Sequence, residues 1–232
     1  MGKYNMIEAT YIDHMGTDLS VVNAARVSYR KRSEWETDYK QVPIWGQEVL
    51  SKRDTKLIHY LAKHKHYSPF NHTYITYHVK APIYVARQLV KHEYMPWNEV
   101  SGRYVVFEAD FYEPEQFRMS AEDKKQGSGE DATDDLNAEF STIFTEEQQR
   151  AIAAYKKCLE MGMAEEQARS RLPLDLMTEW YWSGTVKAFH KMCSLRCASD
   201  TQYETRLVAD NISEKMATLY PVSWDALMQG EK

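Results

Sequence analysis

Residues 87–104 read RQLVKHEYMPWNEVSGRY, a short run that joins an apolar helical pattern to a dense group of polar side chains. The residues before it, 81–86, place Pro82 where the first turn of a helix tolerates proline, and the apolar spacing predicts a helix from there onward. Pro96 is expected to stop this helix, because proline has no N–H to donate and disfavours helical backbone in the residue before it. Spacing of three and four residues is expected to put one set of polar side chains on a shared face: Gln88, Lys91 and His92.

The second half of the run, 98–104, is expected to be a loop that enters a strand. Alternate strand residues point to the same side, so Glu99, Ser101 and Arg103 are expected to face one way. An acid, a hydroxyl and a guanidinium together can bind a ligand that carries both an anion and a polar ring. Taken singly, each residue also fits a solvated helix end or an exposed edge strand. The whole set favours a binding site.

The composition is that of a soluble protein with one domain. The chain has 232 residues, 43% of them hydrophobic, which suffices for a sizeable core, and we expect a single domain over 1–232. No run approaches the roughly 20 apolar residues of a membrane span, and the first residues lack a secretory leader, which predicts a cytoplasmic protein without a membrane partner. A formal charge of -5 argues against sequence-independent nucleic-acid binding, although a mononucleotide needs only a few local arginines.

The cysteines indicate neither a disulfide framework nor a metal centre. Cys158, Cys193 and Cys197 form an odd set without a CxxC pair, which fits a reducing compartment and offers no zinc site. We therefore expect no bound metal. Cys193 and Cys197 are one helical turn apart and are expected only to pack.

The remaining pattern predicts an α+β fold with a mixed or antiparallel sheet, flanking helices and a helical C-terminal third. Aromatic residues at 180, 181, 182 and 189 are expected in the core or in a subunit interface rather than around a cofactor. Residues 30–48 look like a polar, irregular surface insertion, and 119–135 like an exposed, mobile loop. The periodicity predicts strands over 3–13 and 73–79, and helices from 17, over 54–65, 145–162, 174–195 and 201–219, with Gly162 as a helix C-cap.

The run at 98–104, NEVSGRY, resembles the second half of the signature of the flavin-dependent thymidylate synthases, which ends in Ser-x-Arg-Tyr. The first half of that signature departs, because Lys91-His92-Glu93 replaces Arg-His-Arg and Pro96 replaces a usual Ser. Four further blocks resemble the same family in the same order: AARVS at 24–28, HKHYSPF at 64–70, Ala168-Arg169 with LPL at 172–174, and Leu195-Arg196 with Gln202. The resemblance covers roughly residues 18 to 225.

This resemblance implies an FAD-dependent methyltransferase that converts deoxyuridine monophosphate (dUMP) to thymidylate (dTMP). Methylenetetrahydrofolate would supply the carbon, and FAD reduced by NADPH or NADH would supply the hydride, since the cofactor carries the difficult chemistry. The family also implies a homotetramer whose active sites draw on several subunits. The implied dUMP contacts are Gln88, Lys91, Glu99, Ser101, Gly102, Arg103, Arg169 and Arg196.

Arg196 matches the catalytic position of the family, where a cation polarises the pyrimidine. A guanidinium is always charged and presents a planar fork of donors, so it can stabilise the anionic ring and raise the nucleophilicity of C5. None of the cysteines lies in the Pro-Cys-His context of the folate-only enzymes. Ser101 is the nearest hydroxyl candidate for a nucleophile, but no histidine stands at an obvious spacing beside it, which favours hydrogen bonding to the substrate phosphate.

The implied flavin contacts depart more from the family pattern. They are Ser28, His66, Ser68, Lys91, His92, Glu93, Asn98, Glu99, Thr185, Lys187 and Lys191. The family more often has Asn, Arg and Asn at the last three positions, and Asn71 replaces a usual Glu. His66 fits a solvated helix end as well as a ring contact. Glu93 reverses a charge near a dianionic cofactor, and we expect it to pair with a lysine such as Lys91 or Lys191.

Two alternative functions stay open at this level. The altered flavin motif could favour a flavin-dependent pyrimidine nucleotide hydroxymethylase, in which water rather than hydride resolves the methylene adduct. The chain could also be a catalytically silent nucleotide-binding homologue that kept the Ser-Gly-Arg-Tyr pocket and lost flavin. Product analysis separates the first alternative from methylation, and flavin absorption separates the second.

Overall fold

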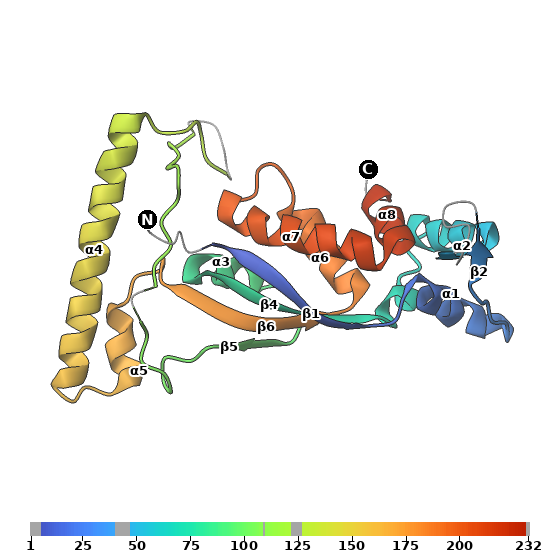
Figure 1. Ribbon diagram of the computed structural model, residues 1–232, viewed down its shortest axis with the longest axis horizontal. Helices are drawn as coiled ribbons and strands as arrows, with labels where there is room; N and C mark the ends of the chain where they lie inside the picture. The colour runs from blue at the N-terminus through green and yellow to red at the C-terminus, as the bar shows by residue number, and fades with distance from the viewer. Residues whose placement is uncertain (1–5, 40–46, 109, 122–126, 231–232) are drawn as a thin grey trace.

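The computed structural model describes residues 6–39, 47–108, 110–121 and 127–230 (Figure 1). Its centre is a four-stranded sheet in the order β1-β4-β6-β5, with every neighbouring pair antiparallel. The strands are β1 (Glu8–Met15), β4 (Tyr74–Pro82), β6 (Met177–Gly184) and β5 (Trp97–Glu99). Helices flank this sheet, which confirms the α+β prediction. The strands predicted over 3–13 and 73–79 are found with shifted ends, although residues 1–5 lie outside the described part.

Alternation along the two central strands creates one buried face. In β4, Ile75, Tyr77 and Val79 are fully buried, and the residues between them are half-buried. In β6, Trp180 and Trp182 are buried while Tyr181 is half-exposed. This period of two is what a strand with one covered face requires.

The prediction of one helix over 174–195 was wrong, because its first half is the strand β6. Aromatic residues fit a pleated surface well, and Trp180 and Trp182 use the strand period to reach the core. The helix that follows, α6 (Val186–Arg196), begins after Thr185, whose side chain accepts a hydrogen bond from the Ala188 N–H at 3.2 Å. The prediction that these aromatic side chains serve the core is confirmed for Trp180, Trp182 and Phe189.

Two C-terminal helices join α6 on the covered face of the sheet (Figure 1). They are α7 (Tyr203–Leu219), which confirms the helix predicted over 201–219, and α8 (Pro221–Gln229), which was not predicted. Phe189 packs edge-on against the rings of Tyr77 and Trp182, with centroid distances of 5.3 and 5.5 Å. Cys193 is buried in the same core, as expected.

One end of the molecule consists of α1 (Asp18–Arg26), the short 3-10 helix η1 (Val27–Tyr29) and α2 (Lys52–Lys63) (Figure 1). Both predicted helices are confirmed, and α2 packs on α8. The segment 30–48 is not wholly irregular, because β2 (Glu36–Asp38) pairs with β3 (Gln47–Val49). Residues 40–46, between these strands, lie outside the described part of the chain.

The opposite end carries α4 (Asp134–Glu160), α5 (Glu165–Ala168) and the 3-10 helix η3 (Arg169–Arg171) (Figure 1). The helix α4 begins at 134 rather than at the predicted 145, with Thr133 as its N-cap and two aspartates in its first turn, where the helix dipole favours them. Gly162 has a φ of 84° just beyond the helix end, as its predicted capping role requires.

The predicted loop 119–135 is partly packed against the body. The Met119 N–H donates to the Glu130 carbonyl at 2.8 Å, the Ala132 N–H donates to the Phe117 carbonyl at 2.9 Å, and Ala132 is buried. Residues 122–126 lie outside the described part. None of the described helices is long and apolar enough to cross a membrane.

Candidate functional site

The first group of predicted site residues meets where α3 (Ile83–Leu89) and α6 both end. The Arg196 Nε donates to His92 Nε2 at 3.2 Å, and Arg196 Nη2 lies 3.5 Å from the Gln88 carbonyl oxygen. The Gln88 side-chain amide donates to the side-chain oxygen of Gln202. All four residues are half-buried. We call Gln88, His92, Arg196 and Gln202 the Arg196 cluster.

Electrostatics in the Arg196 cluster keep the histidine neutral and the arginine available. Burial, followed by the charges of Arg196 and Lys191, lowers the pKa of His92 to about 4. Neutral His92 can therefore accept the Arg196 hydrogen bond at Nε2, which places its proton on Nδ1. Burial also lowers the pKa of Arg196 from its ordinary value. No carboxylate among the described residues forms an ion pair with Arg196, so its charge is free to face an anionic ligand.

The helix that begins at Ile83 ends at Leu89 and does not continue to Pro96 as predicted. The next positions of its apolar stripe would fall on His92 and Glu93, which have no apolar surface to bury, and the chain turns there with Tyr94 at a φ of 60°. The prediction that three polar residues share one helix face is therefore wrong for two of them. Gln88 lies on α3, whereas Lys91 and His92 lie in the turn after it.

A second group surrounds a turn rather than a strand. The N–H groups of Tyr104 and Val105 both donate to the Ser101 carbonyl, at 3.0 and 3.1 Å, and the Arg103 N–H lies 3.4 Å from Ser101 Oγ. The strand β5 has already ended at Glu99, so the prediction that 99, 101 and 103 share one strand face was wrong.

Glycine is needed inside this turn because the chain folds back on itself. A Cβ at position 102 would lie 2.3 Å from Cε2 of Phe107 and 3.2 Å from Cδ of Arg169, so Gly102 brings the turn against the start of η3. The Arg169 Nε donates to the Glu166 carbonyl at 3.3 Å, and both arginines are exposed. We call Ser101, Gly102, Arg103 and Arg169 the turn group.

Glu99 is held at the sheet edge by its own neighbours. Its carboxylate accepts from the Thr178 hydroxyl at 2.7 Å and from the Trp97 indole N–H at 3.0 Å. Each oxygen keeps a second acceptor site, so Glu99 is positioned and can still bind a ligand. Asn98 beside it is exposed.

A third group lies along the first half of α6 and the 3-10 helix η2 (Ser68–Asn71). The Thr185 hydroxyl donates to the Asn71 side-chain oxygen at 2.9 Å. Lys187 Nζ lies 3.7 Å from the centroid of the Tyr67 ring and 2.8 Å from Nδ1 of the buried His190. Tyr67 and His190 were not among the predicted site residues, although the spacing of 187 and 190 on a helix could have indicated the contact of Lys187 with His190. Ser68 begins η2 beside Tyr67.

The predicted pairing of Glu93 with a lysine is confirmed. Lys191 Nζ lies 3.4 Å from Glu93 Oε2, and the two side chains are 65% and 68% exposed. Lys91, the other lysine considered, is exposed in the same turn. The pair neutralises one of the lysines that the family resemblance assigns to flavin.

The last two predicted flavin contacts lie at the α1–α2 end of the molecule. Ser28 is in η1, and the ring centroid of His66 lies 6.1 Å from that of Tyr60 on α2. Between the Arg196 cluster and the turn group, the described residues form no hydrogen bond or ion pair. No set of three or more His, Cys, Asp or Glu side chains in the described ranges could hold a metal ion.

Comparison with known proteins decides the family. The family model described as thymidylate synthase complementing protein matches residues 10–222. A flavin-dependent thymidylate synthase of Thermus thermophilus is 40% identical over 215 residues, 93% of this chain and 73% of the relative. The chain belongs to the flavin-dependent thymidylate synthase family. A second member, from Kosmotoga olearia, is 38% identical over 94% of this chain and 88% of the relative.

A solved structure extends the family comparison to the fold. The UMP/dUMP methylase PolB from Streptomyces cacaoi, bound with 5-Br dUMP, superimposes with a TM-score of 0.80 at 29% identity and covers 97% of this chain and 96% of that one. The PolB structure bound with 5-Br UMP gives a TM-score of 0.82 at 28% identity. The family fold predicted from the sequence is thereby confirmed.

Proposed function

We propose that this protein is a cytoplasmic enzyme that methylates dUMP to dTMP, with methylenetetrahydrofolate as carbon donor and FAD, reduced by NADPH or NADH, as hydride source. The observation that carries this proposal is Arg196, a half-buried guanidinium held by His92 and Gln88 and without a carboxylate partner in the described chain. Family membership gives that arrangement its chemistry, because the relatives are named flavin-dependent thymidylate synthases.

Arg196 has the properties needed to activate the pyrimidine. Methylation requires C5 to become a nucleophile, and a cation beside the N3–C4 edge stabilises the anionic ring in which C5 carries electron density. The hydrogen bond to neutral His92 orients the guanidinium without cancelling its charge. Arg196 therefore lowers the barrier by electrostatic stabilisation rather than by accepting a proton.

The turn group supplies the groups that suit a phosphate. Arg103 and Arg169 are exposed, which leaves their donor forks open to an anion, and the Ser101 hydroxyl can donate beside them. Glu99 adds an acceptor at the sheet edge. Because these residues make no polar contact with the Arg196 cluster of the same described chain, we propose that the two groups meet across subunits of a homotetramer.

The residues around α6 fit a flavin. Lys187 and Lys191 are one turn apart on α6, Thr185 and Ser68 add hydroxyls, and Lys91 lies in the turn that also carries Glu93. These cations and donors suit a pyrophosphate, with Glu93 offsetting one charge. FAD held there would supply a hydride for reduction of the one-carbon unit.

Two measurements on the purified protein test this proposal. The first is the absorption spectrum, which should show a flavin. The second is mass spectrometry of the product made from dUMP, methylenetetrahydrofolate and NADPH, with UMP assayed in parallel because the name of PolB includes UMP. We expect dTMP. A hydroxymethylated nucleotide would favour the hydroxymethylase alternative, and a colourless, inactive protein with dUMP affinity would favour the silent nucleotide-binding homologue.

A further inference from the structure

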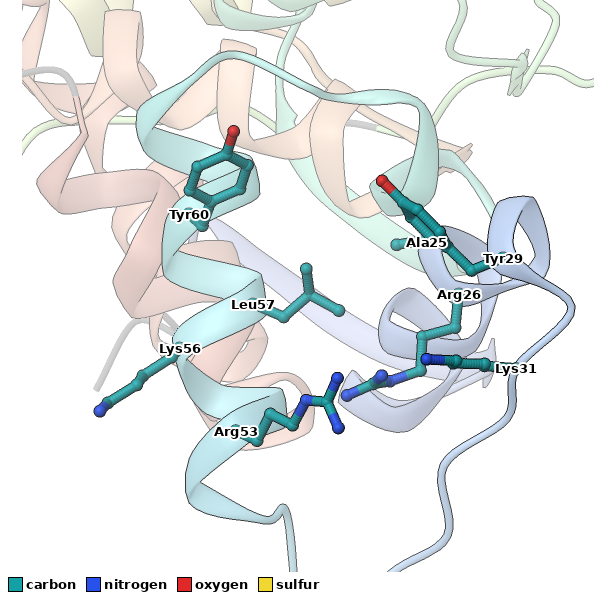
Figure 2. A pocket seen from close by; sticks show the side chains of 8 residues that line it. All are labelled: Ala25, Arg26, Tyr29, Lys31, Arg53, Lys56, Leu57 and Tyr60. Atoms are coloured by element: carbon teal, nitrogen blue, oxygen red, sulfur yellow. The ribbon is translucent and has the colours of Figure 1, made fainter.

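A pocket of about 430 Å³ opens between the α1–η1 segment and α2, at the end of the molecule far from α4 (Figures 1 and 2). None of its lining residues belongs to the Arg196 cluster or to the turn group. The residues that matter for its chemistry are Arg26, Tyr29, Lys31, Arg53, Leu57 and Tyr60. We call it the α1–α2 pocket.

One end of the α1–α2 pocket is cationic. Figure 2 shows the charged ends of Arg26, Lys31 and Arg53 converging from three parts of the chain. Arg26 is paired with the buried Asp54. Burial alone would raise the pKa of Asp54, but hydrogen bonds, the largest from Arg26, outweigh it and hold that pKa below its ordinary value. The Arg26–Asp54 ion pair therefore has no net charge, and it fixes the position of Arg26 in the wall of the pocket.

Lys31 and Arg53 differ from Arg26 in their pairing. No described carboxylate forms an ion pair with either of them, and like charges brought together repel unless an anion joins them. Glu34 and Glu36 line a neighbouring hollow, which shares Arg26, Lys31 and Arg53 with the pocket. The convergence therefore suits a ligand with at least one anionic group.

The other end of the α1–α2 pocket is aromatic. Tyr29 is 78% exposed and Tyr60 53% exposed, and Leu57 lines the same pocket. Figure 2 shows the two tyrosine side chains on opposite walls of the pocket, at the end away from Lys31 and Arg53. Two exposed rings at one mouth can sandwich or flank a planar ligand ring. The pocket thus matches a ring at one end and an anion at the other.

The pocket borders two residues assigned to flavin by family resemblance. Tyr29 directly follows Ser28, and the Tyr60 ring contacts His66 at a centroid distance of 6.1 Å. A ligand in the α1–α2 pocket would therefore lie beside the flavin. The molecules that must approach a flavin in the proposed reaction are its reductant and the folate.

We propose that the α1–α2 pocket binds the anionic, ring-bearing end of one of these co-substrates. Lys31 and Arg53 bind the anion, and Tyr29 and Tyr60 hold the ring. Both co-substrates carry an anionic group beside a ring. In a nicotinamide dinucleotide these are the phosphates and the adenine, and in a folate they are the glutamate carboxylates and the aminobenzoyl ring. The assignment rests on the proposed function, because that function places flavin and both co-substrates in this protein.

The test compares two doubly substituted proteins that lose the same charge. The pocket variant is Lys31→Gln with Arg53→Gln. The control is Lys52→Gln with Lys63→Gln, both exposed residues of α2 that do not line the pocket. Calorimetric titration of each flavin-containing protein uses NADPH, NADH, and folate with one or with three glutamates, and flavin content is recorded for every sample.

We expect the pocket variant to bind one co-substrate about tenfold more weakly than wild type, while the control stays close to wild type. A loss for NADPH that is larger than the loss for NADH identifies the phosphates, and a loss for triglutamyl folate alone identifies the carboxylates. Equal binding by both variants, no binding of either co-substrate by wild type, or loss of flavin from the pocket variant would overturn the proposal. If the wild type binds as expected but makes no dTMP, the proposed function fails and the pocket assignment does not.

Discussion

The Arg196 cluster and the turn group differ in how much of their geometry the single chain already provides. In the first, each side chain is half-buried and hydrogen-bonded to another member, and the histidine is held neutral by burial and by neighbouring cations. In the second, both arginines are exposed and bond at most to their own segment. Under the proposed function, the half of the site that acts on the pyrimidine is therefore preorganised, whereas the half proposed for the phosphate would gain its final geometry from a ligand or a partner subunit.

This difference predicts different kinetic consequences. A preorganised charge acts on the transition state, so its loss lowers kcat. An exposed donor contributes to binding substrate and transition state alike, so its loss mainly raises KM.

The largest effect is expected for Arg196→Ala. Removing the charge beside the pyrimidine should lower kcat by about 10²–10³, by analogy with the loss of an oxyanion-hole donor. The fold should survive, because a half-buried guanidinium at a helix end does not hold the core together, and thermal unfolding should confirm this. Arg150→Ala, an exposed arginine on α4, is the matched control and should be fully active. Near-normal turnover by the Arg196 variant would refute the assigned role.

Ser101→Ala should have a smaller effect of another kind. The lost hydrogen bond to an anionic phosphate should raise the KM for dUMP by about tenfold and leave most of kcat. Steady-state kinetics with dUMP measure both constants. If turnover vanished while dUMP affinity stayed unchanged, Ser101 would be a nucleophile after all, and the turn group would belong to the chemistry.

A change of a few-fold is expected for Glu93→Arg. The variant removes the exposed ion pair with Lys191 and adds a cation near the proposed flavin pyrophosphate, so FAD should bind more tightly to the apo protein. Salt should shrink the gain, because exposed charges are screened. FAD titrations at low and high salt measure this, with Glu160→Arg on α4 as a control of equal charge. Equal or weaker binding at both salt concentrations would show that Glu93 serves the native site. We also expect the wild-type protein to be isolated partly depleted of flavin.

The smallest expected effect is the contribution of His92 to the pH dependence of folding stability, which is absent at neutral pH. Its pKa is lowered to about 4 in the folded chain from the ordinary 6.5, so the unfolded chain takes up a proton first as pH falls. The stability that depends on neutral His92 is therefore complete above pH 6.5 and declines between 6.5 and about 4. Titration of the His92 ring by NMR should give this low pKa, and Arg196→Ala should raise it partway. A pKa near 6.5 in both proteins would contradict the electrostatic account of the cluster.

Sequence patterns were sufficient where structure is set locally. The helix start at Thr17, the strand β4 and the helix end near Gly162 all depend on near neighbours along the chain, and each was predicted. The strand β6 was mistaken for helix because its aromatic run continues almost directly into α6. Only Thr185 separates the two elements.

For the candidate site, too, the sequence predicted only what depends on single residues or near neighbours. Resemblance named the residues, and simple charge reasoning predicted the pairing of Glu93 with a lysine. The turn at 101–105 could not be foreseen, because it depends on close packing of Gly102 against Phe107 and Arg169. The α1–α2 pocket likewise arises from segments that only the fold brings together.

A single-turnover experiment tests the central claim most directly. The flavin of the purified protein is reduced without oxygen, excess reductant is removed, and methylenetetrahydrofolate is added with or without dUMP. We predict that flavin colour returns only with dUMP and that one dTMP forms for each flavin oxidised. Formation of a hydroxymethylated nucleotide while the flavin stays reduced, or reoxidation without dTMP, would contradict it.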